Sequence, residues 1–332
     1  LVAFAAAYYQ RSLGELALSV LPPELRRLDA TQLARRVARL KVATTPPAAA
    51  VALPALTPDQ AAAVEALAGM APGPCLLHGV TGSGKTEVYL RAAADTLAAG
   101  RQVLLLVPEI NLTPQLEARL AERFAGHRLV TLHSALTPAQ RLKHWLAAHL
   151  GQADLVLGTR LAVFASLPRL GLIVVDEEHD PSFKQQEGAR YSARDLAVYR
   201  ARLEGVTVVL GSATPSIETW QRAEQGAYRR LALPLRVGGG VLPRVRVVDM
   251  QAQPRQPGAG QDTAISAPLL TALRLRLERG EQSLVLLNRR GYAPVLHCGA
   301  CGWKSGCPHC SAWRVFHKAD RTLRCHHCGF TE

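Results

Sequence analysis

The octapeptide Gly79-Val80-Thr81-Gly82-Ser83-Gly84-Lys85-Thr86 fits the phosphate-binding loop pattern G-x-x-x-x-G-K-[ST] at every fixed position. Its glycines let the backbone curl, so that successive N–H groups can point at phosphates. The apolar run 75–78 before the loop predicts a strand, and residues 85–99 after it predict a helix whose N-terminus favours anions. We therefore expect all eight residues to bind a nucleoside triphosphate, with Lys85 on the β/γ-phosphates and Thr86 on Mg²⁺.

An acidic motif at residues 176–179 follows the β-branched apolar run 172–175. Such a run is typical of a central strand in a parallel sheet, and the carboxyl end of that strand faces bound phosphates. We predict that Asp176 holds Mg²⁺, directly or through water. Glu177 is expected to orient and deprotonate the attacking water. Together with Lys85, these two carboxylates form the predicted catalytic set.

Three further apolar runs end in small, hydroxyl or polar residues. The first covers 102–107 and leads into Pro108-Glu109, the second ends in Gly158-Thr159-Arg160, and the third ends in 211–215. Open α/β sheets bind their ligands at the carboxyl ends of parallel strands. The sequence therefore predicts the α/β class, with a P-loop lobe built on a doubly wound parallel sheet.

Six stretches of this chain resemble the superfamily 2 helicases, and among these the bacterial replication-restart helicases, from about Thr57 to the C-terminus. The stretches are GVTGSGKTEVYL (79–90), LVPEINLTPQ (106–115), LHSALTPAQR (132–141), DEEHDPSFKQQEGARYSARDLAVYRA (176–201), LGSATPSIE (210–218) and LNRRGYAP (287–294). The resemblance implies a RecA-like helicase lobe and part of a second lobe that carries a cysteine-rich, zinc-binding insertion.

The same resemblance implies an activity and a set of partners. The activity is that of an ATP-dependent 3′–5′ DNA helicase that recognises stalled or abandoned replication forks and initiates primosome assembly. The cofactors are ATP, Mg²⁺ and Zn²⁺, with two zinc ions in the complete family protein. The partners are forked and single-stranded DNA, the single-stranded-DNA-binding protein, other primosome proteins, and the replicative helicase with its loader. A cytoplasmic protein without a membrane partner is expected.

Composition agrees with a polyanionic partner. The chain has 332 residues and a formal net charge of +13, with a pI near 9.9. A basic surface of this kind favours nucleic acid, although many soluble proteins simply carry solvated lysine and arginine. No uncharged apolar stretch is long enough to predict a transmembrane helix.

Six of the seven cysteines form three C-x-x-C knuckles near the C-terminus, each of which can present two thiolates to zinc. A reducing cytosol argues against the alternative of disulfides. The second and third knuckles, separated by 14 residues, predict one four-thiolate site. In the resembling family the first knuckle pairs with a fourth one, so that site is expected to be incomplete here, with His297, His309, His326 and His327 as alternative ligands. The predicted zinc ligands are Cys298, Cys301, Cys307, Cys310, Cys325 and Cys328.

Residues outside these motifs are candidates for DNA and adenine contacts. The segment 183–191 mixes aromatic and basic side chains without helical or strand periodicity, which suits stacking on single-stranded bases and contacts to phosphates. The resemblance implies an aromatic-rich loop at this place that couples DNA binding to hydrolysis. We predict DNA contacts from Arg160, Lys184, Arg190 and Tyr191. Gln60 fits both an adenine-reading glutamine and a capping box with Thr57.

Breaks in the pattern predict five parts of the chain, which is interpreted as a fragment. They are an N-terminal helical segment (1–42, with helices at 4–21 and 29–40 and Thr31 as a cap), a linker (43–55), helicase lobe 1 (56–233), the start of lobe 2 (234–297) and a truncated zinc ribbon (298–332). Residues 1–42 are interpreted as a remnant leading into the winged-helix region of the family. In lobe 2 we expect strands at 245–248 and 284–287 and a helix at 268–279.

Two other functions are compatible with parts of this pattern. One is a zinc-ribbon DNA-binding platform or helicase loader with little or no ATPase activity. The other is a nuclease subunit, against which the lack of a metal-nuclease carboxylate cluster in the sequence argues. Intact Lys85, Asp176 and Glu177 favour the ATP-driven motor over the platform.

Overall fold

The computed structural model describes residues 1–40, 53–239, 243–250, 265–286, 295–298 and 300–332. The chain divides into two compact units, Leu1–Val241 and Leu242–Glu332. Most of the linker predicted at 43–55 and all of the motif at 287–294 lie outside the described residues. No helix within the described ranges is long and apolar enough to span a bilayer.

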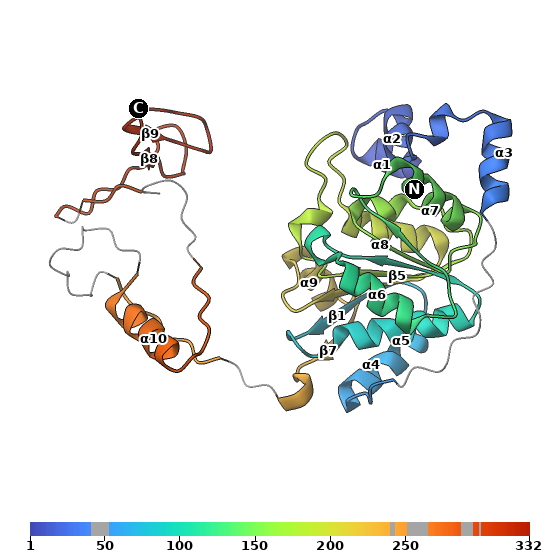
Figure 1. The fold of residues 1–332 in the computed structure, drawn as a ribbon, viewed down its shortest axis with the longest axis horizontal. Helices are drawn as coiled ribbons and strands as arrows, with labels where there is room; N and C mark the ends of the chain where they lie inside the picture. The colour runs from blue at the N-terminus through green and yellow to red at the C-terminus, as the bar shows by residue number, and fades with distance from the viewer. Residues whose placement is uncertain (41–52, 240–242, 251–264, 287–294, 299) are drawn as a thin grey trace. The chain divides into compact units, whose positions relative to one another are not determined.

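The first unit is built on a parallel, seven-stranded sheet with the order β3-β4-β2-β5-β6-β1-β7 (Figure 1). This confirms the predicted α/β class. The central strand β5 lies between β2 and β6, and β6 lies beside β1, so the acidic motif and the phosphate-binding loop end at the same sheet edge. The strands are β1 (Pro74–Gly79), β2 (Gln102–Leu106), β3 (Leu129–Leu132), β4 (Leu155–Gly158), β5 (Leu170–Asp176), β6 (Thr207–Ser212) and β7 (Arg229–Leu233).

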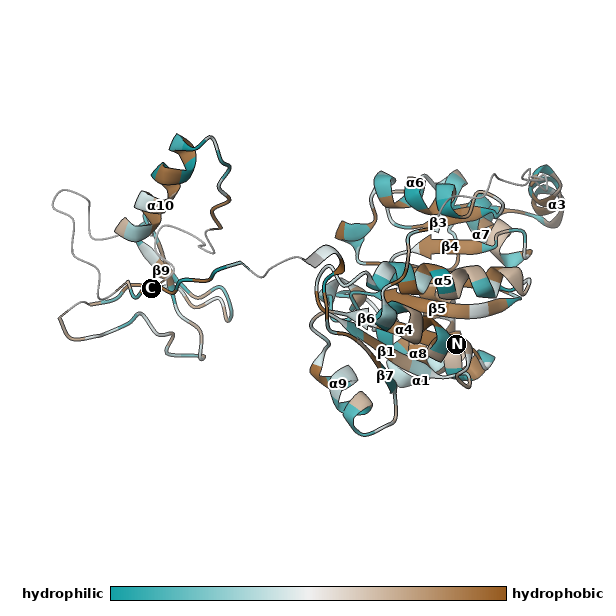
Figure 2. Ribbon diagram, turned by 90° about the horizontal axis from the view of Figure 1, so that it is seen from below, coloured by the Kyte–Doolittle hydropathy of each residue, from teal (hydrophilic) through white to brown (hydrophobic). Residues whose placement is uncertain are grey.

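Helices cover both faces of this sheet, because successive residues of a buried strand point to opposite sides. On β2, Leu104 and Leu106 belong to one hydrophobic cluster and Val103 and Leu105 to the other. In Figure 2 the strands are mostly brown, and the helices beside them carry both teal and brown residues. One cluster takes side chains from α4 (Pro58–Ala68), α5 (Lys85–Ala98) and α6 (Pro114–Arg123), and the other from α1 (Val2–Tyr8), α2 (Leu13–Val20), α7 (Pro138–His149) and α8 (Ala193–Glu204).

Shorter elements complete the connections of this unit. Helix α9 (Ile217–Glu224) follows β6 and contacts β1 and β7. Short 3₁₀ helices serve as connectors, η1 between α2 and α3 and the other four after strands. They are η1 (Leu25–Arg27), η2 (Glu109–Asn111), η3 (Arg160–Phe164), η4 (Pro181–Phe183) and η5 (Val237–Gly239).

The N-terminal segment differs from its prediction in two details. The helix expected over 4–21 is two helices, α1 and α2, separated by a turn in which the Ser12 hydroxyl accepts a hydrogen bond from Glu15 N (3.2 Å). Helix α3 (Ala30–Arg39) is capped by Asp29 rather than Thr31, because the Asp29 carboxylate accepts from Gln32 N at 2.7 Å. We call Val2–Val20 the N-terminal hairpin. It is packed into the core of the first unit.

The second unit contains helix α10 (Ala267–Glu278) and a two-stranded antiparallel sheet of β8 (Val315–His317) and β9 (Thr322–Arg324). The helix predicted at 268–279 is confirmed. The predicted strand at 245–248 is wrong for these residues, and so is the described part of the one at 284–287. Val245 and Val247 are 84% and 90% exposed, and no described strand pairs with them. A strand needs a neighbour that supplies hydrogen bonds and apolar cover, and β propensity alone does not supply either.

Candidate functional site

The phosphate-binding loop connects β1 to α5 at the ligand edge of the sheet. Gly82 and Gly84 have φ angles of 80° and 78°, a left-handed backbone that favours glycine. Most helices of the first unit begin with a serine, threonine or aspartate whose side chain caps them, but α5 begins at Gly84 without a side-chain cap. Its first N–H groups therefore remain available to an anion, which fits a phosphate.

The Ser83 side chain gives a second sign that the loop fits a ligand. Its hydroxyl oxygen is buried and has no hydrogen-bond partner among the described residues. A buried polar atom without a partner costs free energy unless something else satisfies it. The backbone of the loop is held from outside, since Val80 N donates to Leu233 O (3.2 Å) and Val237 N donates to Gly82 O (2.9 Å).

Lys85 is the first residue of α5. Its side chain is buried, its Nζ donates to Gly79 O (3.0 Å), and it lies 4.0 Å from Glu177 Oε1. The structure thus brings the lysine of the loop and the second carboxylate of the acidic motif together. Thr86, the predicted Mg²⁺ ligand, is exposed at the first turn of α5.

Asp176 ends β5 and is oriented from two sides. Its Oδ1 accepts from the Tyr89 hydroxyl (3.0 Å) and from Glu177 N (3.1 Å), and burial raises the pKa of its carboxyl. Glu177 has a φ of 49°, a strained backbone for a residue with a Cβ, and its carboxylate lies 4.0 Å from Lys85 Nζ and 3.6 Å from His179 Nδ1. The two carboxylates predicted from the sequence therefore share one edge with Lys85.

Tyr89 is a site residue that the sequence analysis missed. It lies on α5, is buried, and places its hydroxyl on Asp176, so that the phosphate-binding helix holds the predicted metal ligand. Gly211 on β6 makes room for it, because a Cβ at that position would collide with the Tyr89 hydroxyl. A tyrosine four residues after Lys85 has the spacing of an ordinary core residue of the helix, so no local pattern distinguishes it.

We expect Tyr89→Phe to weaken the effect of Mg²⁺ on nucleotide binding. Losing one hydrogen bond to a carboxylate leaves Asp176 less well oriented, which corresponds to about a tenfold loss in the Mg²⁺-dependent part of the affinity. Titration of a fluorescent ATP analogue with and without Mg²⁺ measures that part. The affinity without Mg²⁺ and the melting temperature should stay near wild type. Tyr8→Phe, at a 67% exposed position on α1, is the control, and an equal loss there would contradict the assignment.

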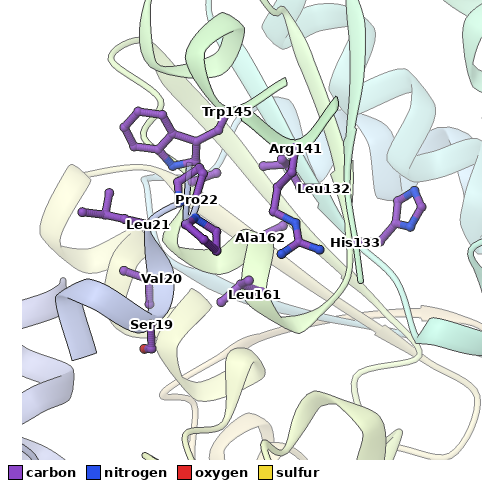
Figure 3. Close-up of a pocket in the computed structure, with 12 residues that line it drawn as sticks. Ser19, Val20, Leu21, Pro22, Leu132, His133, Arg141, Trp145, Leu161 and Ala162 are labelled. Carbon is purple, nitrogen blue, oxygen red and sulfur yellow. The ribbon is translucent and has the colours of Figure 1, made fainter. Parts of the chain in front are cut away.

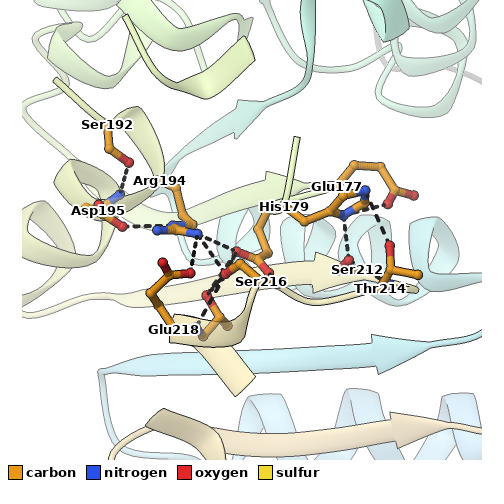
Figure 4. A network of polar contacts seen from close by, with 11 residues as sticks. Glu177, His179, Ser192, Arg194, Asp195, Ser212, Thr214, Ser216 and Glu218 are labelled. Carbon is orange, nitrogen blue, oxygen red and sulfur yellow. Dashed lines mark hydrogen bonds and ion pairs between the residues drawn. The ribbon is translucent and has the colours of Figure 1, made fainter. Parts of the chain in front are cut away.

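The other two residues of the acidic motif contact the segment after β6 (Figure 4). His179 Nδ1 lies 2.7 Å from Ser212 Oγ, and Thr214 N donates to the same Oγ at 3.0 Å. Glu178 is fully buried and accepts from Ser216 N (2.7 Å), with further contacts to Thr219 and Arg194. The acidic motif is therefore connected to the start of α9 by side chains that only the fold brings together.

Gln60 forms the predicted capping box at the start of α4. Its Oε1 accepts from Thr57 N (2.9 Å), and its Nε2 donates to Ser83 O (2.9 Å), so it also holds the phosphate-binding loop. The side chain is buried. Its predicted contact with adenine remains a prediction.

The predicted DNA contacts are arranged around one loop, residues 184–191. Lys184 and Arg190 are exposed on it, and Arg160 approaches from η3, donating to Gln185 Oε1 at 2.6 Å. Tyr191 corrects the prediction. It is 4% exposed, packs edge-on against Phe164, and burial raises its pKa to about 12. Its ring belongs to the hydrophobic core and offers no face to a base.

The four cysteines of the last two knuckles form a candidate zinc site. The sulfur atoms of Cys307, Cys310, Cys325 and Cys328 lie within 4.8 Å of one another. The Cys307–Cys328 and Cys310–Cys325 sulfurs are 3.5 Å apart, near the edge of about 3.8 Å that a tetrahedron with Zn–S bonds of about 2.3 Å requires. Within the described residues, Cys298 and Cys301 have no such completed set.

A separate pocket lies between the N-terminal hairpin and the sheet (Figure 3). It has a volume of about 70 Å³ and is lined mostly by apolar side chains from α2, β3, α7 and η3, with Arg141 and Trp145 on one wall. None of the phosphate-loop or acidic-motif residues lines it.

Two family models match parts of this chain, and the longer match includes the residues of this site. Residues 57–223 match the DEAD/DEAH box helicase family, and the chain belongs to that family. Residues 307–332 match the PriA DNA helicase Cys-rich region domain. The match that begins at residue 57 encloses both the phosphate-binding loop and the acidic motif, which the geometry places at one edge.

Curated relatives carry one particular name, Replication restart protein PriA. The protein of Haemophilus influenzae is 48% identical over 254 residues, which are 76% of this chain and 34% of that protein. That of Bacillus subtilis is 42% identical, over 77% of this chain and 31% of its own length. That of Rickettsia felis is 38% identical, over 99% of this chain and 48% of its own length. The predicted resemblance to replication-restart helicases is thus confirmed, and the chain spans about a third to a half of these relatives.

Among solved structures, RecG bound to a three-way DNA junction is similar at 23% identity, over 70% of this chain and 30% of that one. Its TM-score is 0.43.

Proposed function

We propose that this chain provides the nucleotide-binding lobe of an ATP-dependent DNA helicase that acts in replication restart. The observation that carries the proposal is the arrangement of Lys85, Asp176 and Glu177 at one edge of a parallel sheet, beside an uncapped helix N-terminus. That arrangement suits the binding and hydrolysis of a nucleoside triphosphate. Similarity to the replication restart proteins named PriA supports the choice of DNA and of restart as the biological role.

In the proposed reaction, the loop residues and Lys85 bind the phosphates of ATP, while Thr86 and Asp176 hold Mg²⁺. Bound Mg²⁺ would neutralise charge on the phosphate oxygens. Glu177 accepts a proton from the attacking water, and Lys85 stabilises the negative charge that develops on the γ-phosphate. In the described structure, Lys85 bonds to Gly79 O and Glu177. A bound phosphate would take the place of these partners.

Single-stranded DNA is the proposed polyanionic partner, with Arg160, Lys184 and Arg190 contacting its phosphates. The net charge of +13 supports a salt-dependent interaction of this kind. We further propose movement in the 3′–5′ direction, action on forked DNA in the cytoplasm, and partners among the single-stranded-DNA-binding protein, the primosome proteins and the replicative helicase with its loader. One zinc ion in this chain and two in the whole protein belong to the same proposal, as do the domain limits predicted from the sequence.

The alternative of a zinc-ribbon platform without ATPase activity is not favoured. A platform that does not hydrolyse ATP does not need the phosphate-binding loop, Lys85 and the two carboxylates close together. In this protein Lys85 lies near Glu177, and Glu177 N donates to Asp176.

Replacing Lys85 with alanine tests the proposed nucleotide site. The change removes a buried cationic contact to the phosphates, so we expect nucleotide affinity to fall by about 10²-fold, while the fold and the zinc content stay unchanged. Binding of a fluorescent ATP analogue in the presence of Mg²⁺ measures the affinity, and circular dichroism checks the fold. Lys143→Ala, an exposed lysine on α7, is the matched control. Equal affinity for Lys85→Ala and wild type would refute the assigned site.

A further inference from the structure

The loop at residues 184–191 has an ordered base. Lys184 and Ser192 form an antiparallel bridge, and Gln185 N donates to Tyr191 O at 2.8 Å. Phe183, before the loop, and Tyr191, at its end, are both buried in the core cluster. The tip, from Gln186 to Arg190, is mostly exposed. The loop is therefore fixed at both ends. A ligand that contacts its exposed tip can affect the rest of the protein only through the residues at its base.

The N-terminal hairpin contacts this loop at three points, although the two lie more than 170 residues apart in sequence. Ser192 N donates to the Tyr9 hydroxyl at 3.0 Å, and the Lys184 ammonium lies 5.4 Å from the centre of the Tyr9 ring. Arg11 Nη2 donates to Gly188 O at the tip of the loop (2.8 Å). One short turn of the hairpin thus holds the base and the tip together.

The hairpin is itself firmly placed. Ala5, Ala6 and Leu16 are almost completely buried and belong to the same core cluster as the sheet. The Phe4 ring stacks on Tyr199 of α8, the helix that follows the loop. A residue held by this packing can impose its position on a loop, because cores do not deform continuously.

From the base of the loop, a continuous set of polar contacts leads to the acidic motif (Figure 4). Ser192 caps α8 through its hydroxyl, which accepts from Asp195 N at 3.2 Å. Asp195 Oδ1 in turn accepts from Arg194 Nε at 2.8 Å. Arg194 Nη1 lies 2.7 Å from Ser216 Oγ and 3.4 Å from Glu178 Oε2. Glu178 is two residues from Asp176 and is fully buried. Removing a partner of the buried Glu178 carboxylate leaves one of its oxygens less well satisfied.

We propose that the N-terminal hairpin positions the 184–191 loop. Tyr9 and Arg11 are its positioning residues, and the contacts that run from Ser192 through Asp195 and Arg194 to Glu178 carry the state of the loop to the acidic motif. The part of this inference that concerns DNA rests on the proposed function. It assigns to residues 1–20 a role inside the motor, since they hold the very segment that carries Lys184 and Arg190.

Amide hydrogen exchange, measured residue by residue on the whole chain, tests the positioning directly. The variant is Tyr9→Phe combined with Arg11→Gln, and the control is Tyr8→Phe, at the last residue of α1, which is 67% exposed. We expect the amides of Gln185 and Arg190 to exchange about fivefold faster in the variant, the factor expected for one lost hydrogen bond that restrains the loop. These amides do not bond to Tyr9 or Arg11. If only the Ser192 amide changes, the hairpin does not position the loop, and the inference is overturned.

A second measurement addresses the connection to the acidic motif. Nucleotide affinity is determined with a fluorescent ATP analogue, with and without an oligo-dT strand, in wild type and in the double variant. We expect the variant to keep the affinity of wild type without DNA and to lose most of the change that DNA causes. An unchanged DNA effect in the variant would overturn the coupling. Absence of any binding of nucleotide or DNA by wild type would instead refute the proposed function, while the exchange measurement would still decide the positioning.

Discussion

Replacing Glu177 with glutamine should stop hydrolysis and leave nucleotide binding intact. The amide keeps the size of the side chain and loses the base that takes a proton from water, so we expect the rate to fall by about 10²- to 10⁴-fold. Glu177 is suited to this role because it lies beside Lys85, with 4.0 Å between Oε1 and Nζ. Release of phosphate from ATP in single-turnover experiments, with protein in excess over ATP, measures the rate even when it is slow.

The control for this experiment is Glu122→Gln, an exposed glutamate on α6. Glu177→Gln should bind the fluorescent ATP analogue at least as tightly as wild type, because removing a carboxylate near the phosphates lowers repulsion. Glu122→Gln should match wild type in both binding and hydrolysis. Hydrolysis by Glu177→Gln at the rate of wild type would exclude Glu177 as the base and leave Asp176 as the remaining carboxylate at this edge.

Replacing Cys307 with serine should release the zinc ion of the C-terminal ribbon. Structural zinc in small domains is bound with an apparent free energy of about 10–16 kcal/mol, and most of this is folding free energy of the ribbon. The strands β8 and β9 have only three residues each, too little to fold on apolar burial alone. We expect zinc content, measured by atomic absorption, to fall from one ion per chain to none. The first unit should melt at its normal temperature.

Cys298→Ser provides the matched control, because the first knuckle has no completed set of four ligands in the described residues. Its zinc content should stay at one ion per chain. Two zinc ions in wild type would show that the first knuckle also binds metal, and would point to neighbouring histidines as the missing ligands.

Local patterns in the sequence predict the phosphate-binding loop, the acidic motif, the cysteine knuckles and the parallel sheet. The octapeptide ending in Lys85-Thr86 needs only its own glycines and the strand and helix beside it, so it is recognised without any knowledge of the fold. The same is true of Asp176 and Glu177 after a β-branched run, and of the C-x-x-C pairs. Each of these signals is short-range, since the chemistry depends on a few consecutive residues and on a known strand end. The parallel sheet follows from the same pattern of strands.

The remaining features depend on which segments the fold brings together. Nothing in the sequence near Tyr89 indicates that its hydroxyl reaches Asp176, or that Gly211 must lack a side chain to admit it. The sequence of the segment around Tyr191 predicts an exposed aromatic loop. In the structure, Phe183 and Tyr191 at the base of that loop are buried in the core. Tyr9 and Arg11 contact this loop although they precede it by more than 170 residues in the sequence. Side-chain contacts between segments that are distant in sequence depend on how the whole sheet and its helices pack. A local sequence pattern therefore cannot predict them.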